Sequence, residues 1–280
     1  MYKIIEKTYL NPTVAKITVE APLVAKKIEP GQFIILMVEE NGERVPFTVA
    51  DFDSEKGTVT VIFQIVGATT MKLAEKEAGE YIAQFAGPLG KPTEFGEVKR
   101  VAVVGGGLGC AIAYPQAKYL FGKGVEVDII AGFKTRDLII LEDEMKAVSN
   151  NLYITTDDGS YGEKGLVTDK LKSLAEKQRY DLVIAIGPVI MMKFVTLAAK
   201  EFDMPVIVSL NPIMIDGTGM CGGCRVMVGG KVQFACVDGP DFDGYKVDFD
   251  NLMNRNRAYA EAEKKAVEEH KCRIGRTEGH

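Results

Sequence analysis

The sequence predicts a β-barrel followed by an α/β domain with a doubly wound parallel sheet, then a small cysteine-containing loop module. Residues 1–95 hold short β-branched runs that alternate at period two, residues 96–210 alternate strand-like and helical stretches, and residues 211–250 hold three of the five cysteines. We therefore expect domains at 1–95, 96–210 and 211–250, with a helical C-terminal tail at 251–280.

The composition excludes several functional classes. The chain has 280 residues, is 46% hydrophobic and 26% charged, and carries a net charge of −5, which is typical of a globular protein of about two domains that binds neither nucleic acid nor an anionic membrane. No uncharged apolar run reaches the ~18 residues of a membrane helix. An odd number of cysteines and an N-terminus without an export signal predict a cytoplasmic protein.

The first segment is expected to form a small antiparallel barrel. Short strands are predicted at residues 16–19, 32–38, 47–50, 58–63 and 81–85, with one helix at about 70–76. Residues 44–48 bring a cation, a proline, an aromatic ring and a hydroxyl to one strand start, and residues 66–70 end a strand and open a helix that could bind a phosphate. Taken alone, such patterns are more often ordinary barrel packing and a helix cap.

The second segment predicts a nucleotide-binding sheet. Strands are expected at residues 100–104, 125–131, 151–156, 181–186 and 205–210, with helices after Gly109 and at 143–149, 166–177 and 189–201. The glycine loop at 105–109 follows the first strand and opens a helix, as a dinucleotide pyrophosphate requires. Gly187-Pro188 ends another strand at the same edge. The alternative is a structural turn.

The residues alone do not decide between NAD and NADP. No acidic residue stands at the very end of the second strand, where a carboxylate would bind the ribose 2′-hydroxyl. Residues 132–136 instead offer Lys134 and Arg136, which could bind a 2′-phosphate.

The cysteine loop predicts a [2Fe–2S] cluster. Cys221, Cys224 and Cys236 are soft thiolate ligands among glycines, and Asp216 lies five positions before the first cysteine. A zinc site, a disulfide or a ligand-free turn are the alternatives, but no histidine lies nearby and a disulfide would leave one cysteine unpaired. An aspartate in such a loop also commonly bonds its own backbone.

The remaining motifs suggest that a bound group carries the chemistry. The two histidines, His270 and His280, lie in the tail, away from any predicted core, which argues against a Ser-His or Cys-His hydrolase. Cys110 and Cys272 are isolated, and no role is expected for them. Residues 260–269 form a strongly helical segment with few apolar side chains, either a solvated helix or an arm that packs on a partner.

Over residues 1–250 the chain resembles the ferredoxin–NADP reductase superfamily, in the branch of dihydroorotate dehydrogenase electron-transfer subunits. The motifs that carry this resemblance are residues 105–109, 156–162, 187–188 and 236–240. Within the branch it is most similar to small (alpha) subunits of NADH-dependent reduced ferredoxin:NADP oxidoreductases, also called sulfide dehydrogenase subunits.

The resemblance implies three sites. FAD would contact Arg44, Pro46, Phe47, Thr48, Val49, Phe63, Ile65, Val66, Gly67, Thr69 and Thr70, with residues 46–48 facing the isoalloxazine and residues 67–70 the pyrophosphate. NAD(H) would contact Gly106, Gly107, Leu108, Gly109, Asp157, Asp158, Gly159, Gly187 and Pro188. The cluster would bind to Asp216, Cys221, Cys224 and Cys236.

The chain departs from the family pattern at three positions. Val45 stands where the flavin-site arginine is usual, with Arg44 one residue earlier, and Thr69 stands where the phosphate loop usually has a second glycine. Asp216 stands in register with the first of four cluster cysteines. This last departure is similar to the ferredoxin:NADP oxidoreductase subunits and unlike the dihydroorotate enzyme.

The implied function is electron transfer between NAD(H), FAD and a [2Fe–2S] cluster, with no protein base required. The family implies a partner, a large flavo-iron-sulfur subunit that resembles the glutamate synthase small subunit, and coupling of NAD, NADP and ferredoxin through the complex by flavin-based electron bifurcation. Two alternatives are kept: the electron-transfer subunit of an NAD-dependent dihydroorotate dehydrogenase, and a non-enzymatic iron–sulfur redox sensor, which predicts neither flavin nor NADH oxidation.

Overall fold

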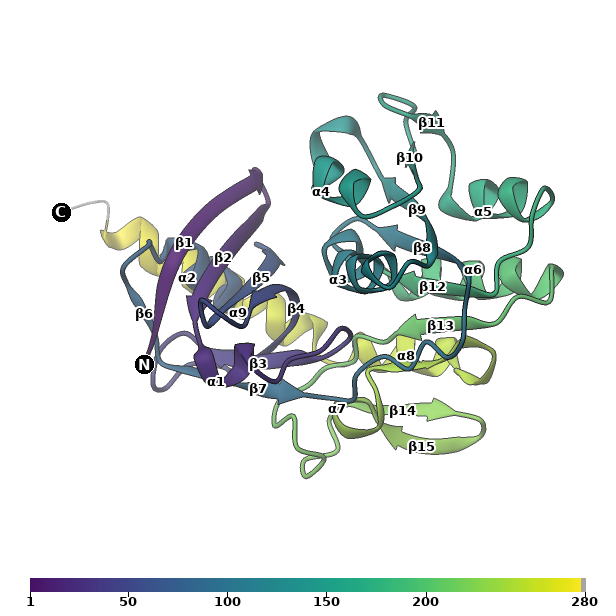
Figure 1. Cartoon of the computed structure of the whole chain (residues 1–280). Coiled ribbons are helices and arrows are strands. Elements are labelled where there is room, and N and C mark those ends of the chain that lie inside the picture. The colour runs from purple at the N-terminus through teal and green to yellow at the C-terminus, as the bar shows by residue number, and fades with distance from the viewer. Residues whose placement is uncertain (278–280) are drawn as a thin grey trace.

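Two seven-stranded sheets lie side by side and carry most of the chain (Figure 1). The computed structural model describes the backbone of residues 1–277 and the side chains of residues 1–272. The first sheet is a nearly closed antiparallel barrel, and the second is a parallel sheet with helices on both faces. The predicted fold class is therefore confirmed.

The barrel has the strand order β6-β1-β2-β5-β4-β3-β7. Its core forms because alternate residues of each strand, such as Ile17, Val19, Val59 and Val61, are fully buried on the inner face. Its elements are β1 (Tyr2–Asn11), β2 (Val14–Glu20), α1 (Pro22–Ala25), β3 (Phe33–Met37), β4 (Val45–Asp53), β5 (Thr58–Gln64), α2 (Ala68–Glu75), β6 (Tyr81–Ile82) and β7 (Gln84–Leu89).

The second sheet has the order β11-β10-β9-β8-β12-β13-β16, parallel except for β16. Helices α3 and α4 cover one face and α5 and α6 the other. The elements are β8 (Arg100–Gly106), α3 (Gly109–Gly122), β9 (Glu126–Phe133), η1 (Arg136–Leu138), α4 (Glu142–Ala147), β10 (Asn151–Thr156), β11 (Glu163–Lys164), α5 (Val167–Ala175), β12 (Leu182–Ile186), α6 (Val189–Glu201) and β13 (Val206–Ser209). The strand order reverses between β8 and β12, which is where such sheets bind ligands.

The segment with Cys221 and Cys224 is followed by a hairpin, by a short helix that carries Cys236, and by an edge strand of the second sheet. The hairpin is β14 (Arg225–Val228) with β15 (Lys231–Phe234), followed by α7 (Ala235–Asp238), β16 (Asp241–Asp243) and η2 (Gly244–Lys246). Strand β16 pairs antiparallel with β13, Phe242 opposite Val208. Strand β16 was not predicted, because three residues with two aspartates give no strand pattern.

The tail forms α8 (Phe249–Asn256) and α9 (Ala260–Thr277). Phe249 and Leu252 of α8 are buried in the core, and α9 runs along the barrel and contacts α2 (Figure 1). The expectation that His270 lies away from any core is wrong: it is 8% exposed, and its Nε2 lies 3.2 Å from Glu75 Oε1. This contact spans most of the chain, so local sequence carried no sign of it. His280 lies outside the described residues.

Within residues 1–277, none of the helices has the combination of length and apolar character needed to cross a bilayer.

Candidate nucleotide cleft and cluster loop

A cleft of about 890 Å³ lies between the barrel and the second sheet. The carboxyl ends of the parallel strands line one side, and Thr48 and Gln64 of the barrel line the other. Eight residues predicted from the resemblance meet in this cleft: Thr48, Gly106, Gly107, Leu108, Gly109, Asp157, Gly187 and Pro188. The predicted flavin strand and the predicted nucleotide loop therefore share one space.

Two glycines let the ends of β8 and β12 approach each other closely. A Cβ on Gly109 would lie 2.2 Å from the carbonyl oxygen of Ile186, and one on Gly106 would lie 2.3 Å from Met191 Sδ. Any larger residue at either position would displace a neighbour, backbone in the first case. The loop thus offers main-chain surface and the N-terminus of α3 to the cleft, which suits a pyrophosphate.

The residues of the predicted segment 157–159 have different positions. Asp157 lines the cleft, and its N–H donates to the carbonyl oxygen of Phe133 at 3.1 Å. Asp158 instead accepts hydrogen bonds from the hydroxyl of Ser160 at 2.6 Å and from its N–H at 2.9 Å, and these bonds lower the pKa of Asp158. Asp158 therefore stabilises the turn, and neither it nor Gly159 lines the cleft.

Strand β4 presents alternate residues to the barrel core and to the cleft. Phe47 and Val49 are buried in the core, where the Phe47 ring contacts that of Phe63 with centroids 5.7 Å apart and an angle of 63°. Thr48, on the opposite face, lines the cleft, and Pro46 is half-buried. Of the residues expected to face the isoalloxazine, the structure turns the Thr48 side chain toward the cleft and the Phe47 ring toward the core.

The turn before α2 is organised by a hydroxyl. Thr70 Oγ1 accepts from the N–H groups of Gly67 at 2.9 Å and Val66 at 3.1 Å, and Thr69 donates its hydroxyl to the carboxylate of Glu43. The first-turn N–H groups of a helix have no intrahelical acceptor, so this end of α2 suits a phosphate. Val66 is 62% exposed, and Ile65 packs on the barrel core.

The cluster loop holds a buried pair of thiols and one exposed thiol. Cys224 and Cys236 are each 2% exposed, and burial, with a further contribution from the neighbouring Cys224 thiol, raises the pKa of Cys236 to about 12. Cys221 is exposed, and its pKa is lowered because its sulfur accepts N–H groups from Gly223 and Asp216. Among the described residues, no three His, Cys, Asp or Glu side chains lie close enough to hold one metal ion.

Asp216 adopts a turn conformation. Its Oδ2 accepts the N–H of Thr218 at 3.0 Å and also the Thr218 hydroxyl, and these two bonds are the main reason that the pKa of Asp216 is lowered. The carboxylate thus points to its own loop, while the Asp216 N–H points to Cys221.

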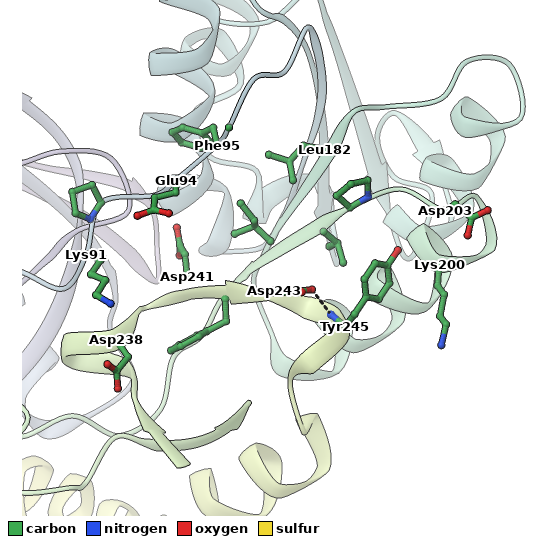
Figure 2. A pocket seen from close by; sticks show the side chains of 16 residues that line it. Lys91, Glu94, Phe95, Leu182, Lys200, Asp203, Asp238, Asp241, Asp243 and Tyr245 are labelled. Carbon is green, nitrogen blue, oxygen red and sulfur yellow. Dashed lines mark hydrogen bonds between the residues drawn. The ribbon is translucent and has the colours of Figure 1, made fainter. Parts of the chain in front are cut away.

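A second cavity, of about 810 Å³, lies beside β16 and the segment that joins the two sheets. Figure 2 shows Asp241 pointing from β16 toward the segment that carries Lys91 and Glu94. Asp241 Oδ2 accepts from Thr93 Oγ1 at 2.5 Å and Gln116 Nε2 at 3.0 Å, and burial raises its pKa. Its position joins the barrel, α3 and the second sheet, so we interpret it as structural.

Comparison with known proteins identifies the family. The iron–sulfur cluster binding domain of dihydroorotate dehydrogenase B matches residues 211–248. A homolog of the dihydroorotate dehydrogenase B (NAD(+)) electron transfer subunit from Thermotoga maritima is 46% identical over 266 residues, which cover 95% of this chain and 94% of that protein. The chain belongs to this electron transfer subunit family.

Solved structures extend the family assignment to the fold. A chain of the NADH-dependent reduced ferredoxin-NADP oxidoreductase, solved for insights into flavin-based electron bifurcation, superposes with a TM-score of 0.91 at 45% identity and covers 96% of this chain and 97% of that one. The ferredoxin reductase of carbazole 1,9a-dioxygenase shares the fold, with a TM-score of 0.62 at 17% identity over 73% of this chain and 65% of that one. The predicted resemblance is confirmed.

In this family member, sequence reasoning missed several residues of the cleft. Gln64 and Ser209 both line it. Each stands at the end of a predicted strand, and Ser209 ends a parallel strand at the ligand edge, so the signal was present. Arg44, expected at the flavin, donates hydrogen bonds to the cluster loop, and no sequence pattern signalled that contact.

Proposed function

We propose that this chain is an electron-transfer flavoprotein subunit that passes electrons between NAD(H), FAD and a [2Fe–2S] cluster, as in NADH-dependent reduced ferredoxin:NADP oxidoreductase. The single observation that carries the proposal is the shared cleft, in which the nucleotide loop faces Thr48 and Gln64 of the barrel. A nicotinamide and a flavin bound there would lie next to each other, so no catalytic side chain is needed.

The residues present fit FAD. Thr48 offers a hydroxyl to a ring bound in the cleft. Thr70 Oγ1 accepts the N–H of Gly67 and so caps α2, and the N–H groups of the first turn that follows are left to bind the phosphates. Bound FAD supplies the exchange between the electron pair of a nicotinamide and single electrons. The roles of the individual side chains are part of this proposal. Phe47, Val49 and Phe63 would act indirectly, because their side chains pack in the barrel core and hold β4 in place.

The residues present also fit a two-iron cluster. Its four ligands are shared between two irons, two on each, and the loop holds its candidates as two pairs. Cys224 contacts Cys236, and the Cys221 sulfur lies against the backbone of Asp216. The N–H groups that lower the pKa of Cys221 would also stabilise a coordinated thiolate.

The second candidate is the electron-transfer subunit of an NAD-dependent dihydroorotate dehydrogenase. The match of residues 211–248 to the cluster domain of that enzyme and the name of the T. maritima relative favour it. The aspartate in place of a cysteine favours the first candidate.

Both require a partner subunit, because the described chain offers no second redox loop; for the first, the partner is a large flavo-iron-sulfur subunit resembling the glutamate synthase small subunit. We place the complex in the cytoplasm.

The test is to purify the chain anaerobically with its partner and measure FAD, iron and the visible spectrum. We expect flavin bands, a broad iron–thiolate shoulder, and NADH-dependent coupling of NADP and ferredoxin. Oxidation of dihydroorotate by the same complex would favour the second candidate. A colourless protein that does not oxidise NADH would reject both and support the redox-sensing regulator. Rates with NADH and NADPH would decide the nucleotide preference.

A further inference from the structure

We infer that Arg44 is a positioning residue for electron transfer: it fixes the cluster loop to the flavin barrel and gives the cluster a nearby positive charge, instead of binding the phosphates of FAD. This inference rests on the proposed function. It differs from the expectation for Arg44 that the family resemblance gave, which was a flavin contact.

The guanidinium connects the two regions directly. Arg44 Nε donates to the carbonyl oxygen of Ile215 at 3.1 Å, and Nη2 donates to that of Asp216 at 3.3 Å. Its Nη1 donates to Gln84 Oε1 at 3.3 Å, on strand β7 of the barrel. Three of the five guanidinium N–H groups are therefore used: two bond to the loop, and the third bonds to Gln84 of the barrel, which orients the guanidinium.

The same short segment is packed against the barrel at a second place. Gly217 has a φ of +82°, and a Cβ there would lie 2.6 Å from Ile35 Cδ1 and 2.9 Å from Leu89 Cδ1. Ile35 is buried on β3, and Leu89 ends β7. The segment that leads into the cluster cysteines is thus held to the barrel by Arg44 on its polar side and by two apolar side chains at Gly217.

The charge of Arg44 has an electrostatic consequence. The Arg44 side chain is half-buried, and its Nη2 donates to the carbonyl oxygen of Asp216, one of the candidate cluster ligands. Reducing an iron–sulfur cluster adds negative charge, so a fixed cation nearby stabilises the reduced form and raises the reduction potential. Arg44 should therefore affect both the geometry and the potential of the cluster.

The test uses the full chain in its complex and three variants. Arg44→Met removes the charge and the hydrogen bonds, and Arg44→Lys keeps the charge but loses the guanidinium fork. Lys56→Met is the matched control, because it removes an exposed barrel cation that pairs with Asp53 at 3.3 Å and with no other carboxylate among the described residues. For each variant, FAD and iron per chain are measured. The reduction potential of the cluster is then obtained from a redox titration followed by electron paramagnetic resonance.

We expect Arg44→Met to keep its FAD and to lower the cluster potential, so that the ratio of reduced to oxidised cluster at a fixed ambient potential falls about fivefold, the order expected for a unit charge within about 10 Å. Arg44→Lys should restore most of the potential but not the wild-type resonance line shape, and Lys56→Met should match wild type.

FAD loss with an unchanged cluster in Arg44→Met and Arg44→Lys would instead identify a phosphate-binding arginine and overturn the inference. Unchanged FAD and unchanged cluster would overturn it equally. Absence of FAD and iron from the wild-type complex would reject the proposed function itself.

Discussion

The nucleotide cleft and the cluster loop are built on different principles. The glycine end of the cleft is made of backbone: glycines at the ends of β8 and β12 bring two strands so close that Gly109 faces the carbonyl of Ile186. The cluster loop is made of side chains: one exposed thiol, two buried thiols and a carboxylate that bonds to its own turn. The first region takes its shape from strand packing, and the second holds its thiols as a buried pair and a separate, exposed one.

This difference follows from what stabilises each site. Strand order and close packing fix the cleft, so its shape does not depend on a ligand. Metal–ligand bonds supply much of the free energy that organises a metal site, so such donors converge when the metal binds. We therefore expect changes in the cleft to affect folding and nucleotide binding together, and changes in the loop to affect the metal with less effect on the fold.

The largest effect is expected for Gly109→Ala. The new Cβ would overlap backbone atoms of Ile186 and Gly187, which cannot move without displacing β12. We expect a loss of more than about 2 kcal/mol in the free energy of unfolding, measured in urea, and weaker NADH binding. Gly122→Ala, at the other end of the same helix, meets no atom within 4 Å and should change stability by less than about 1 kcal/mol. Equal effects of the two variants would show that the close approach is unimportant.

The next effect is expected at the buried thiol pair. Cys224→Ala removes one of two adjacent candidate ligands, so the complex should lose nearly all cluster iron while retaining FAD. Cys272→Ala is the control, because that cysteine is exposed on α9. Iron and flavin are measured on the same anaerobic sample. Full iron content in Cys224→Ala would contradict the cluster assignment.

A smaller effect is expected at Asp216, because three thiolates remain when it is changed. If its carboxylate is a ligand, Asp216→Ala should lose part of the iron or alter the resonance spectrum of the cluster. Thr218→Val separates the two roles, since it removes one of the two hydrogen bonds that hold the carboxylate in the turn, the hydroxyl, and leaves the Thr218 N–H in place. If Asp216 is a ligand, Thr218→Val should keep a normal cluster. If Asp216→Ala has the same iron content and the same spectrum as wild type, the aspartate is only a turn residue.

The sequence predicted what depends on local pattern. Alternating β-branched residues gave the barrel strands, and the order of strand, glycine loop and helix gave the cleft. Strand β1 was missed because charged residues such as Lys3, Glu6 and Lys7 interrupt its apolar alternation. The contact of Arg44 with Ile215 joins residues 171 positions apart, and packing between domains decides it. Long-range contacts of this kind have no local signature.

The smallest effect is expected outside both regions, at Asp241, which links β16 to α3 and to the segment that follows the barrel. Burial raises the pKa of this carboxyl in the folded chain, so folding disfavours its ionised form. Its contribution to stability is therefore fully present below the ordinary aspartate pKa, near 4, and is lost as the pH rises through the raised value. Asp241→Asn stays uncharged, so its free energy of unfolding relative to wild type should be larger at pH 8 than at pH 4.

Asp243→Asn removes an exposed carboxyl of the same strand and serves as the control. A difference between wild type and Asp241→Asn that does not change with pH would mean that this carboxyl is no more difficult to ionise in the folded chain than in the unfolded one.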